Sequence, residues 1–387
     1  MRIGIVAPPW IPIPPPAYGG TERVVALQAA GLAAAGHEVT LVGAPGSAVP
    51  GARIVTPLQE VPPVIGTSTD EWRHVLGGLD ALADVDVVVD HSGPLGALLS
   101  AQGRIPAVHV VHGSLETALL GLYEGVLARA PRLRLAAISR SQRRAAPHLP
   151  FAGVCHNAID VDEAPFRATS DGYLAFLGRM APEKGVEDAI VLARGAGLPL
   201  LIAAKCREPA EQRYFDKAVA PHLGPDVVYL GELDRAATYE FLSHATAMLF
   251  PIRWREPFGM VLIEAMACGT PVLATDRGAV GEIVVDGVTG FVRATAAELA
   301  PLIGRIGEID RAACRRHVAE NFSTDALVES YTRLLATPTV PVVRPVIPVR
   351  GGAATPHSIR SAGHDPAVAT GPARGARSRR PGELNAS

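Results

Sequence analysis

The 387-residue sequence is poor in lysine, in cysteine and in long apolar runs. Lysine occurs only at Lys184, Lys205 and Lys217, and arginine supplies the rest of the 36 positive charges. The four cysteines lie far apart without a C-x-x-C pair, which argues against a disulfide framework and a zinc site and fits reduced thiols. No run approaches the roughly 20 apolar residues of a membrane span. Prolines interrupt the apolar N-terminus before any secretory cleavage site, so we expect a cytoplasmic protein.

The chain also lacks a strong net charge. Its formal charge of −2 argues against a protein that coats nucleic acid. Hydrophobic residues make up 48% and charged residues 19%, which is enough apolar material for sizeable cores. At roughly 150 residues per domain, the length predicts two domains and a tail. From Pro338 onward, Pro, Gly, Ala and Arg lack any periodicity, and we expect this tail to be disordered and solvated rather than bound to lipid or nucleic acid.

Apolar runs alternate with helical patterns in the first part of the chain. A helical pattern from Thr21 to Ala35 is ended by Gly36. The runs that predict strands are Ile3–Ala7, Val39–Val42, Val85–Val89, Ala107–Val111 and Leu135–Ile138, with Val154–Cys155 closing the sheet. This alternation predicts a parallel sheet with helices on both faces.

A second series repeats the alternation after the polar segment Asp160–Gly172, which we interpret as a linker. Its predicted strands are Tyr173–Leu177, Leu198–Ala203, Val227–Leu230, Ala247–Phe250 and Val272–Ala274, and the amphipathic helix Asp325–Leu335 follows them. The predicted organisation is one domain over residues 1–165, a second over 166–322, a C-terminal helix over 323–337 and the tail over 338–387. Because doubly wound sheets bind ligands beyond the carboxyl ends of their strands, we expect the ligand site in the cleft between the domains.

The stretch WREPFGMVLIEAMACGTPVLAT contains the most informative motif. Glu256 precedes a proline and must be extended, and Gly259 opens a helix. Backbone N–H groups around Phe258 and Gly259 are therefore expected to face the cleft and bind an anion. Glu256 and Glu264 can accept hydrogen bonds from hydroxyl groups, so the motif suits a ligand with many hydroxyls and a phosphate, such as a nucleotide sugar. Taken alone, the two glutamates fit ordinary loop and helix charges equally well.

Two cations follow the first strand of the second series, in LGRMAPEKG. Arg179 and Lys184 flank a turn that contains Pro182 and Gly185. This placement lets two positive charges converge on a diphosphate while the next helix begins. The alternative is a surface turn with solvated charges.

A glycine pair follows the first strand of the chain, in PPPAYGGTE. Gly19 and Gly20 lack Cβ atoms, so the backbone can approach a phosphate or sugar closely, and Thr21 is expected to cap the next helix. The segment has no G-x-G-x-x-G pattern and no Walker lysine. Their absence argues against a NAD-dependent oxidoreductase and a P-loop enzyme.

Histidines end two predicted strands of the first domain. His112 precedes a glycine at the expected cleft edge, where it can orient a sugar hydroxyl or relieve developing charge, and His91 is placed similarly with Asp90 beside it. For either histidine alone, a structural role fits better.

Two Asp-x-Asp triplets fit structural roles better than metal binding. Asp84 and Asp86 precede a strand, at the wrong end of the sheet, and Asp160 and Asp162 begin the linker. No metal site is therefore expected. Further residues that follow strands and can line the cleft are Ser139 with Arg140 and Asn157 with Ile159.

Together these segments resemble family four of the retaining glycosyltransferases. The fold of that family, called GT-B, has two facing Rossmann-like α/β domains and a C-terminal helix that returns toward the N-terminal domain. The resemblance covers Met1 to about Ala336 and rests on EPFGMVLIE, GRMAPEKG, YGGTE, and EAMACGTPVLAT followed by GEIVVDGVTGFV. Ala158, in NAID, departs from the glycine of many members, which is a conservative change.

The resemblance implies that the second domain holds a nucleotide diphosphate and the first domain the acceptor. It implies catalytic roles at the donor sugar for Glu256 and His112. The residues that it implies to bind the substrate are Gly19, Gly20, Arg179, Lys184, Phe258, Gly259 and Glu264, with no metal ion and no cofactor. Among these, Arg179 and Lys184 are assigned to the diphosphate and Glu264 to the ribose.

We therefore interpret the chain as a metal-independent, retaining hexosyltransferase that uses a UDP- or GDP-hexose. The acceptor is not specified, and a lipid acceptor would bring peripheral contact with a membrane. The alternatives are a GT-B nucleotide-sugar epimerase, a glycogen synthase-like polymerase and a non-catalytic nucleotide-sugar-binding protein. An intact set of candidate residues argues against the last of these.

Overall fold

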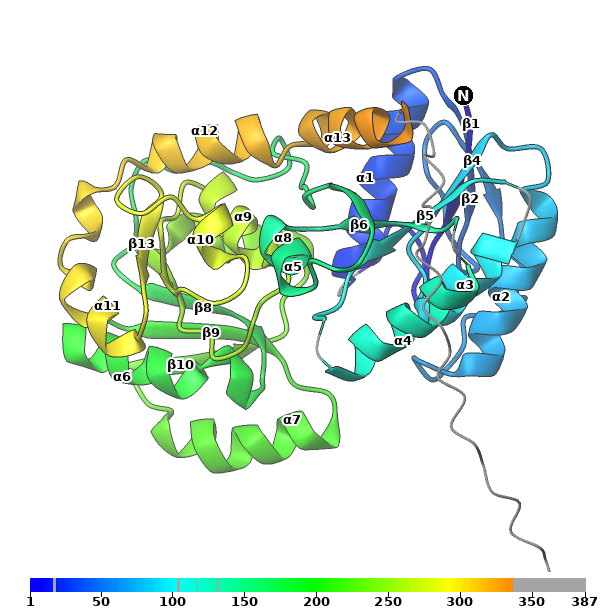
Figure 1. Ribbon diagram of the computed structural model, residues 1–387. Coiled ribbons are helices and arrows are strands. Elements are labelled where there is room, and N and C mark those ends of the chain that lie inside the picture. Colours follow the sequence, from blue (N-terminus) through cyan, green and yellow to red (C-terminus); the bar gives the residue numbers. More distant parts are fainter. Residues whose placement is uncertain (17–18, 103–104, 116, 131, 337–387) are drawn as a thin grey trace, which may run out of the picture. The chain divides into compact units, whose positions relative to one another are not determined.

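The computed structural model describes residues 1–16, 19–102, 105–115, 117–130 and 132–336. The predicted tail and two positions of the glycine segment, Ala17 and Tyr18, lie outside the described residues. The described chain contains two α/β domains, each built on one parallel sheet (Figure 1). None of the helices in these ranges is long and apolar enough to cross a membrane.

The sheet of the first domain has seven parallel strands within the described ranges, in the order β3-β2-β1-β4-β5-β6-β7. Their bounds are β1 Arg2–Val6, β2 Glu38–Val42, β3 Ala52–Val55, β4 Val87–Asp90, β5 Ala107–Val111, β6 Arg134–Ala137 and β7 Phe151–Val154. Every residue of β4 and β5 is buried, as expected of central parallel strands that are covered on both faces.

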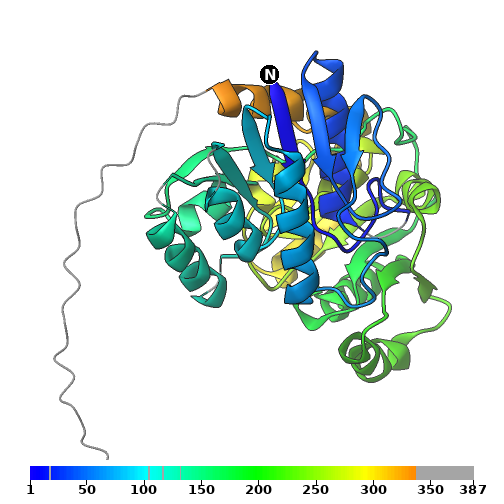
Figure 2. The same ribbon diagram turned by 90° about the vertical axis from the view of Figure 1, so that its right-hand side faces the viewer.

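The two faces of this sheet pack into two apolar cores. Ile3 and Ile5 of β1 belong to the core that contains α1, whereas Val6 belongs to the core that contains Val75 of α2. This division follows the period of two along a strand. The helices of the first domain are α1 Gly20–Ala34, α2 Ser68–Ala81, α3 Pro94–Gln102, α4 Thr117–Arg129 and α5 Arg140–Ala145. Figure 2 views this domain from the side on which α2 crosses the sheet.

The second domain is built on six parallel strands, again counted within the described ranges, in the order β10-β9-β8-β11-β12-β13. The strands are β8 Leu174–Arg179, β9 Leu200–Lys205, β10 Val227–Gly231, β11 Ala247–Phe250, β12 Val272–Thr275 and β13 Gly290–Arg293. The α-helices are α6 Val186–Ala196, α7 Pro209–Tyr214, α8 Arg235–His244, α9 Met260–Ala267, α10 Val280–Ile283, α11 Ala296–Ile303, α12 Arg311–Asn321 and α13 Thr324–Ala336. Short helical turns are η1 Pro182–Lys184, η2 Phe215–Val219, η3 Ala220–His222 and η4 Ile306–Glu308.

Helix α13 follows the second domain in sequence but packs on the first, beside α1 (Figure 1). Val328 occupies the space that Gly31 of α1 leaves, since a Cβ atom at Gly31 would lie 2.4 Å from the Val328 Cγ2. Leu334 lies over Gly153 of β7 in the same way, and Tyr331 is 1% exposed. The predicted return of the C-terminal helix is therefore confirmed.

The predicted strands overlap those of the structure, and β5 and β11 have the predicted bounds, but β7 spans Phe151–Val154, so the predicted strand Val154–Cys155 shares only Val154 with it. The sequence pattern does not predict the edge strands β3 (ARIV) and β13 (GFVR), because each has only two consecutive large apolar residues beside an arginine or glycine. The predicted cap at Thr21 is wrong. Helix α1 begins at Gly20, so Thr21 lies in its first turn, and the capping position is Gly19 with a φ of 154° and no side-chain hydrogen bond.

Candidate active site

A cavity of about 450 Å³ is lined by residues at and beyond the carboxyl ends of strands from both sheets. Its walls come from the loops after β1 and β5 of the first domain and from β8, β9 and the loop after β11 of the second. The strand order of the first sheet reverses between β1 and β4, and that of the second between β8 and β11. Ligands of doubly wound sheets bind at such reversals, because the loops on either side diverge there and leave a crevice.

All nine residues that the sequence singles out as catalytic or substrate-binding line this one cavity. They are Gly19, Gly20, His112, Arg179, Lys184, Glu256, Phe258, Gly259 and Glu264. Asn157 also lines it, whereas the Ser139 side chain is turned to its own helix and accepts a hydrogen bond from the Gln142 N–H at the start of α5. The cavity thus gathers residues from segments up to 245 positions apart, from Gly19 to Glu264.

Lys184 and Glu256 contact each other inside the cavity. The Lys184 Nζ lies 2.7 Å from the Glu256 Oε2, and the two side chains are only 14% and 11% exposed. Trp254, which the sequence analysis missed, donates a hydrogen bond of 3.1 Å from its indole nitrogen to the same carboxylate oxygen. Its ring also lies under the ammonium group, 4.8 Å from the ring centroid. Both partners thereby hold the Glu256 carboxylate in one position.

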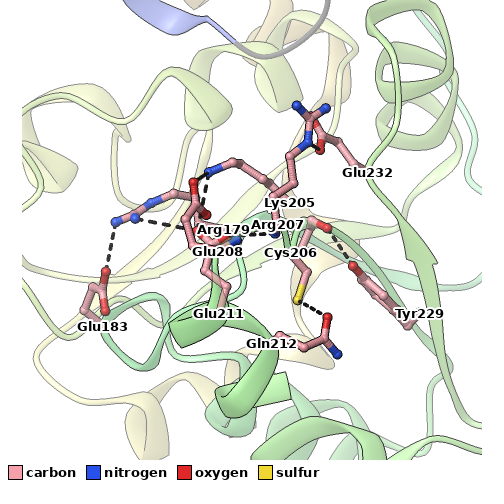
Figure 3. Close-up of polar contacts among 11 residues, drawn as sticks. Arg179, Glu183, Lys205, Cys206, Arg207, Glu208, Glu211, Gln212, Tyr229 and Glu232 are labelled. Atoms are coloured by element: carbon pink, nitrogen blue, oxygen red, sulfur yellow. Dashed lines mark hydrogen bonds and ion pairs between the residues drawn. The ribbon is translucent and has the colours of Figure 1, made fainter. Parts of the chain in front are cut away.

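Arg179 lies in a network of cations and carboxylates at the edge of the cavity (Figure 3). Its guanidinium group donates to Glu183 over 2.9 Å and lies 3.8 Å from Glu211. Lys205, at the end of β9, pairs with Glu208 and with Glu211, lines the same cavity and is 13% exposed. Lys205 is one of only three lysines in the chain, but its sequence context alone does not indicate a role in the site.

Glu211 is buried in this network because it caps a helix. One of its oxygens accepts the backbone N–H groups of Arg207 and Glu208, at 2.9 and 3.2 Å, in the capping box of α7. Its other oxygen faces Arg179 and Lys205 at 3.8 and 3.6 Å. A buried carboxylate therefore holds two cations at the cavity edge.

Glu264, on α9, also lines the cavity. Burial raises the pKa of its carboxyl group above the usual range, and the positive charges of Arg23 and Arg235 oppose that rise. Arg23 lies in the first turn of α1, lines the cavity, and was also missed by the sequence analysis. Its position one turn beyond the glycine pair could have identified it as a site residue. The first turn of a helix that follows a strand at the reversal of strand order faces the crevice.

The start of α9 has the features expected of an anion site. Gly259 precedes the helix with a φ of 97°, which favours glycine, and no side chain caps the helix. Gly259 and Met260 line the cavity, and Phe258 beside them is 2% exposed. Backbone N–H groups at an uncapped helix start attract negative charge. Gly20 lies close by, since a Cβ atom there would be 3.8 Å from the Met260 side chain.

Two further glycines allow the loops around Glu256 to approach one another. A Cβ atom at Gly185, where φ is 75°, would lie 2.0 Å from the Pro251 carbonyl oxygen. A Cβ atom at Gly278, where φ is 67°, would lie 2.1 Å from the Glu256 carbonyl oxygen. Ala279 donates a backbone hydrogen bond of 2.9 Å to that same oxygen. Glycine at these positions thus fixes the backbone on both sides of the Glu256 carboxylate.

His112 is connected to His91. The His112 Nε2 lies 2.8 Å from the His91 Nδ1, and the His91 Nε2 lies 2.7 Å from the Gln28 Oε1. Burial lowers the pKa of His112 to about 3 and that of His91 well below its ordinary value, and the charges of neighbouring histidines add to both effects. Both rings are therefore neutral near pH 7. His112 can orient a hydroxyl group, but it carries no positive charge with which to stabilise developing negative charge.

The two Asp-x-Asp triplets have structural partners. Asp86, at the amino end of β4, pairs with Arg2 at 2.8 Å, and Asp160 accepts a hydrogen bond from the Asp162 N–H in a local turn. Within the described ranges, no three His, Cys, Asp or Glu side chains are grouped so that they could hold a metal ion.

A second cavity of about 450 Å³ adjoins the first at Glu256. The two share Ser114, Glu256 and Pro257. Leu115 of the first domain and Arg255 of the second also line the second cavity. Glu256 therefore lines both cavities.

Two family models match the chain in succession. The model described as Glycosyltransferase Family 4 matches residues 18–163, and the one described as Glycosyl transferases group 1 matches residues 160–326. The two matches meet in the segment between β7 and β8.

Named relatives and solved structures are similar over most of the chain. A phosphatidyl-myo-inositol mannosyltransferase of Mycolicibacterium smegmatis is 30% identical over 320 residues, which is 75% of this chain and 80% of that protein. A glycogen synthase of Mycobacterium tuberculosis is 29% identical over 344 residues, 75% of this chain and 81% of that one. The structure of Anabaena HepE in complex with UDP and glucose superposes with a TM-score of 0.67 at 18% identity, covering 87% of this chain and 100% of that one. This last likeness shows the fold.

Proposed function

The chain belongs to glycosyltransferase family 4, and from that premise we propose that it transfers a hexose from a nucleoside diphosphate sugar to an acceptor hydroxyl group, with retention of configuration and without a metal ion. The observation that carries this proposal is the single cavity in which Lys184, Glu256, Arg179 and the start of α9 meet. The M. smegmatis relative is named a mannosyltransferase, and HepE was solved with UDP and glucose, which supports a hexose donor with a nucleoside diphosphate.

The chemistry of this cavity suits the departure of a diphosphate. The bond between the anomeric carbon and the phosphate oxygen breaks, and the acceptor oxygen bonds to the same carbon from the same face. The acceptor proton passes to the leaving phosphate oxygen, so no protein nucleophile is needed. Arg179, Lys184 and the uncapped start of α9 then stabilise the negative charge that develops on the diphosphate.

Glu256 and Glu264 take different parts of the donor in this proposal. Glu256, held by Lys184 and Trp254 before the helix, accepts hydrogen bonds from hydroxyl groups of the hexose. Glu264, which the positive charges of Arg23 and Arg235 influence, accepts those of the ribose. The acceptor enters through the second cavity, between Ser114 and Arg255, and so reaches the sugar beside Glu256. We place the reaction in the cytoplasm, where the four free cysteines stay reduced.

A donor screen in the presence of EDTA tests the proposal. We expect one of UDP-glucose, GDP-mannose and ADP-glucose to raise the melting temperature by about 5 °C at a concentration of about 100 Kd, because a ligand that binds only the folded state stabilises it. Sugar transfer or slow donor hydrolysis should continue in EDTA, with the anomeric configuration of the product retained. Restoration of activity only by Mg²⁺ or Mn²⁺ would contradict the metal-free mechanism, and inversion at C2 without transfer would indicate an epimerase.

The two carboxylates can be separated by binding measurements. Glu264→Gln should weaken binding of the free nucleoside diphosphate by about tenfold or more, because a charged hydrogen bond contributes about 1.5–3 kcal/mol. Glu256→Gln should leave that affinity nearly unchanged and depress turnover of the intact donor, since the free diphosphate has no hexose. Calorimetric titration of both variants measures this. Glu240→Gln, at an exposed carboxylate on α8, is the control. The opposite pattern would reverse the two assignments.

A further inference from the structure

Three side chains connect helix α1 to the cavity through the interior of the first domain. Gln28 lies on α1 and is 0% exposed, and His91 follows β4 and is 2% exposed. Neither of them lines the cavity, whereas His112 after β5 does. The two contacts between them, Gln28 Oε1 to His91 Nε2 and His91 Nδ1 to His112 Nε2, are 2.7 and 2.8 Å. Both are hydrogen bonds of normal length.

The donors and acceptors along this chain of contacts are determined by its first member. A neutral imidazole has one N–H group and one unprotonated nitrogen. Burial keeps both histidines neutral by lowering the pKa of each. The Gln28 Oε1 can only accept, so the His91 Nε2 must carry the proton. The His91 Nδ1 is then unprotonated and accepts a hydrogen bond from the His112 Nε2–H.

This arrangement determines the protonation state of the second ring nitrogen of His112, Nδ1. With the proton on Nε2, the His112 Nδ1 is unprotonated, and it has no hydrogen-bond partner among the described residues. If the Gln28 amide were turned over, its NH₂ group would donate to His91 and every donor and acceptor in the chain would be exchanged. His112 would then offer an N–H group instead. The Gln28 amide therefore decides whether His112 presents an acceptor or a donor.

We propose that Gln28 and His91 are positioning residues that hold His112 in its Nε2–H tautomer, so that the unprotonated Nδ1 accepts a hydrogen bond from a hydroxyl group of the donor sugar. The part of this inference that concerns the sugar rests on the proposed function. The part that concerns the tautomer does not, because it rests only on the contacts of Gln28, His91 and His112 with one another.

The same domain provides a matched control. His109 of β5 is fully buried and makes two similar contacts of 2.8 Å, one to Asp90 and one to the Tyr123 hydroxyl group. His109 does not line the cavity. Tyr123→Phe therefore removes a buried hydrogen bond next to the sheet without changing the chain that ends at His112. This variant therefore measures the effect of losing a buried hydrogen bond that does not belong to the chain from Gln28 to His112.

The first measurement is a long-range ¹H–¹⁵N correlation spectrum of the ligand-free protein with ¹⁵N-labelled histidine. The His112 signals are assigned by their loss in His112→Asn. We expect a protonated, pyrrole-like Nε2 and an unprotonated, pyridine-like Nδ1 at His112. In Gln28→Met the acceptor is lost and the tautomer of His112 should change or become mixed. Gln28→Glu, whose carboxylate also only accepts, should retain the original tautomer, as should Tyr123→Phe. A protonated Nδ1 at His112 in the unaltered protein would overturn the proposal.

The second measurement compares turnover with binding of the free diphosphate. For the sugar donor accepted in the screen, Gln28→Met should lower kcat/KM by about tenfold, and Gln28→Glu should restore most of it. The Kd of the matching free nucleoside diphosphate should stay unchanged in both variants. A changed tautomer with unchanged kcat/KM would show that His112 does not contact the sugar. Absence of turnover in every variant, with the expected tautomers, would instead count against the proposed function alone.

Discussion

Lys184→Ala is expected to lower donor turnover by about 100-fold. When Glu256→Ala is added to Lys184→Ala, turnover is expected to fall much less than when Glu256→Ala is made in the unaltered protein. The Lys184 ammonium group contacts the Glu256 carboxylate at 2.7 Å, in a pair whose side chains are 14% and 11% exposed. Removing the lysine takes a cation from the diphosphate and also releases the carboxylate that is assigned to the hexose. A charged hydrogen bond contributes about 1.5–3 kcal/mol, and about 1.4 kcal/mol changes a rate tenfold. The loss of two such hydrogen bonds accounts for the expected 100-fold decrease in turnover.

A double-mutant cycle on kcat/KM measures this coupling. The control is Lys217→Ala, which removes an exposed lysine from the same domain and should leave turnover unchanged. If the separate effects of the Lys184 and Glu256 changes add fully, the two side chains act independently and the pair does not organise the site.

Arg311→Met is expected to lower the free energy of unfolding by about 3 kcal/mol. The Arg311 guanidinium group donates hydrogen bonds to four oxygens, at distances of 2.7 to 2.9 Å, that lie in segments far apart in the sequence. They are the carbonyl oxygens of Arg167, Ser243 and Ala245 and the hydroxyl oxygen of Thr270. Methionine fills much of the same space but donates nothing, so these acceptors lose their partners in a half-buried position. Urea denaturation followed by circular dichroism measures the loss.

Arg316, on the same helix, provides the comparison. Its ion pair with Asp310 is exposed, with the two side chains 62% and 60% accessible, so Arg316→Met should change stability by less than about 0.5 kcal/mol. Equal effects of the two substitutions would mean that helix propensity, and not the buried hydrogen bonds, determines the contribution of Arg311.

The position of the site could be predicted from the sequence because the end of each apolar run indicates where a strand ends. Each motif follows an apolar run, and the carboxyl ends of parallel strands lie on one edge of a sheet. Arg179 and the start of α9 could therefore be expected to meet before either was seen in space. The same reasoning placed His112 correctly at the cavity edge.

The partners of these residues could not be predicted in the same way. The Trp254 indole and the Lys184 ammonium group contact the same oxygen of Glu256. The spacing of these residues does not indicate this contact, because it depends on how the loop after β11 packs on the turn after β8. The chain from Gln28 through His91 likewise joins three elements whose order in the sequence carries no sign of contact. Both arrangements depend on how segments far apart in the sequence pack against one another in the folded chain.

The course of helix α13 bears on how chimaeric enzymes can be made from this protein and its relatives. We place the domain boundaries near residues 165 and 322, so the second domain lies in the sequence between residues 1–165 and α13. These two flanking segments pack against each other. A single crossover near residue 165 would pair Gly31 and Gly153 with a foreign final helix, and the close fit of Val328 and Leu334 would be lost. An exchange of donor specificity by recombination therefore needs two junctions, with the native α13 retained.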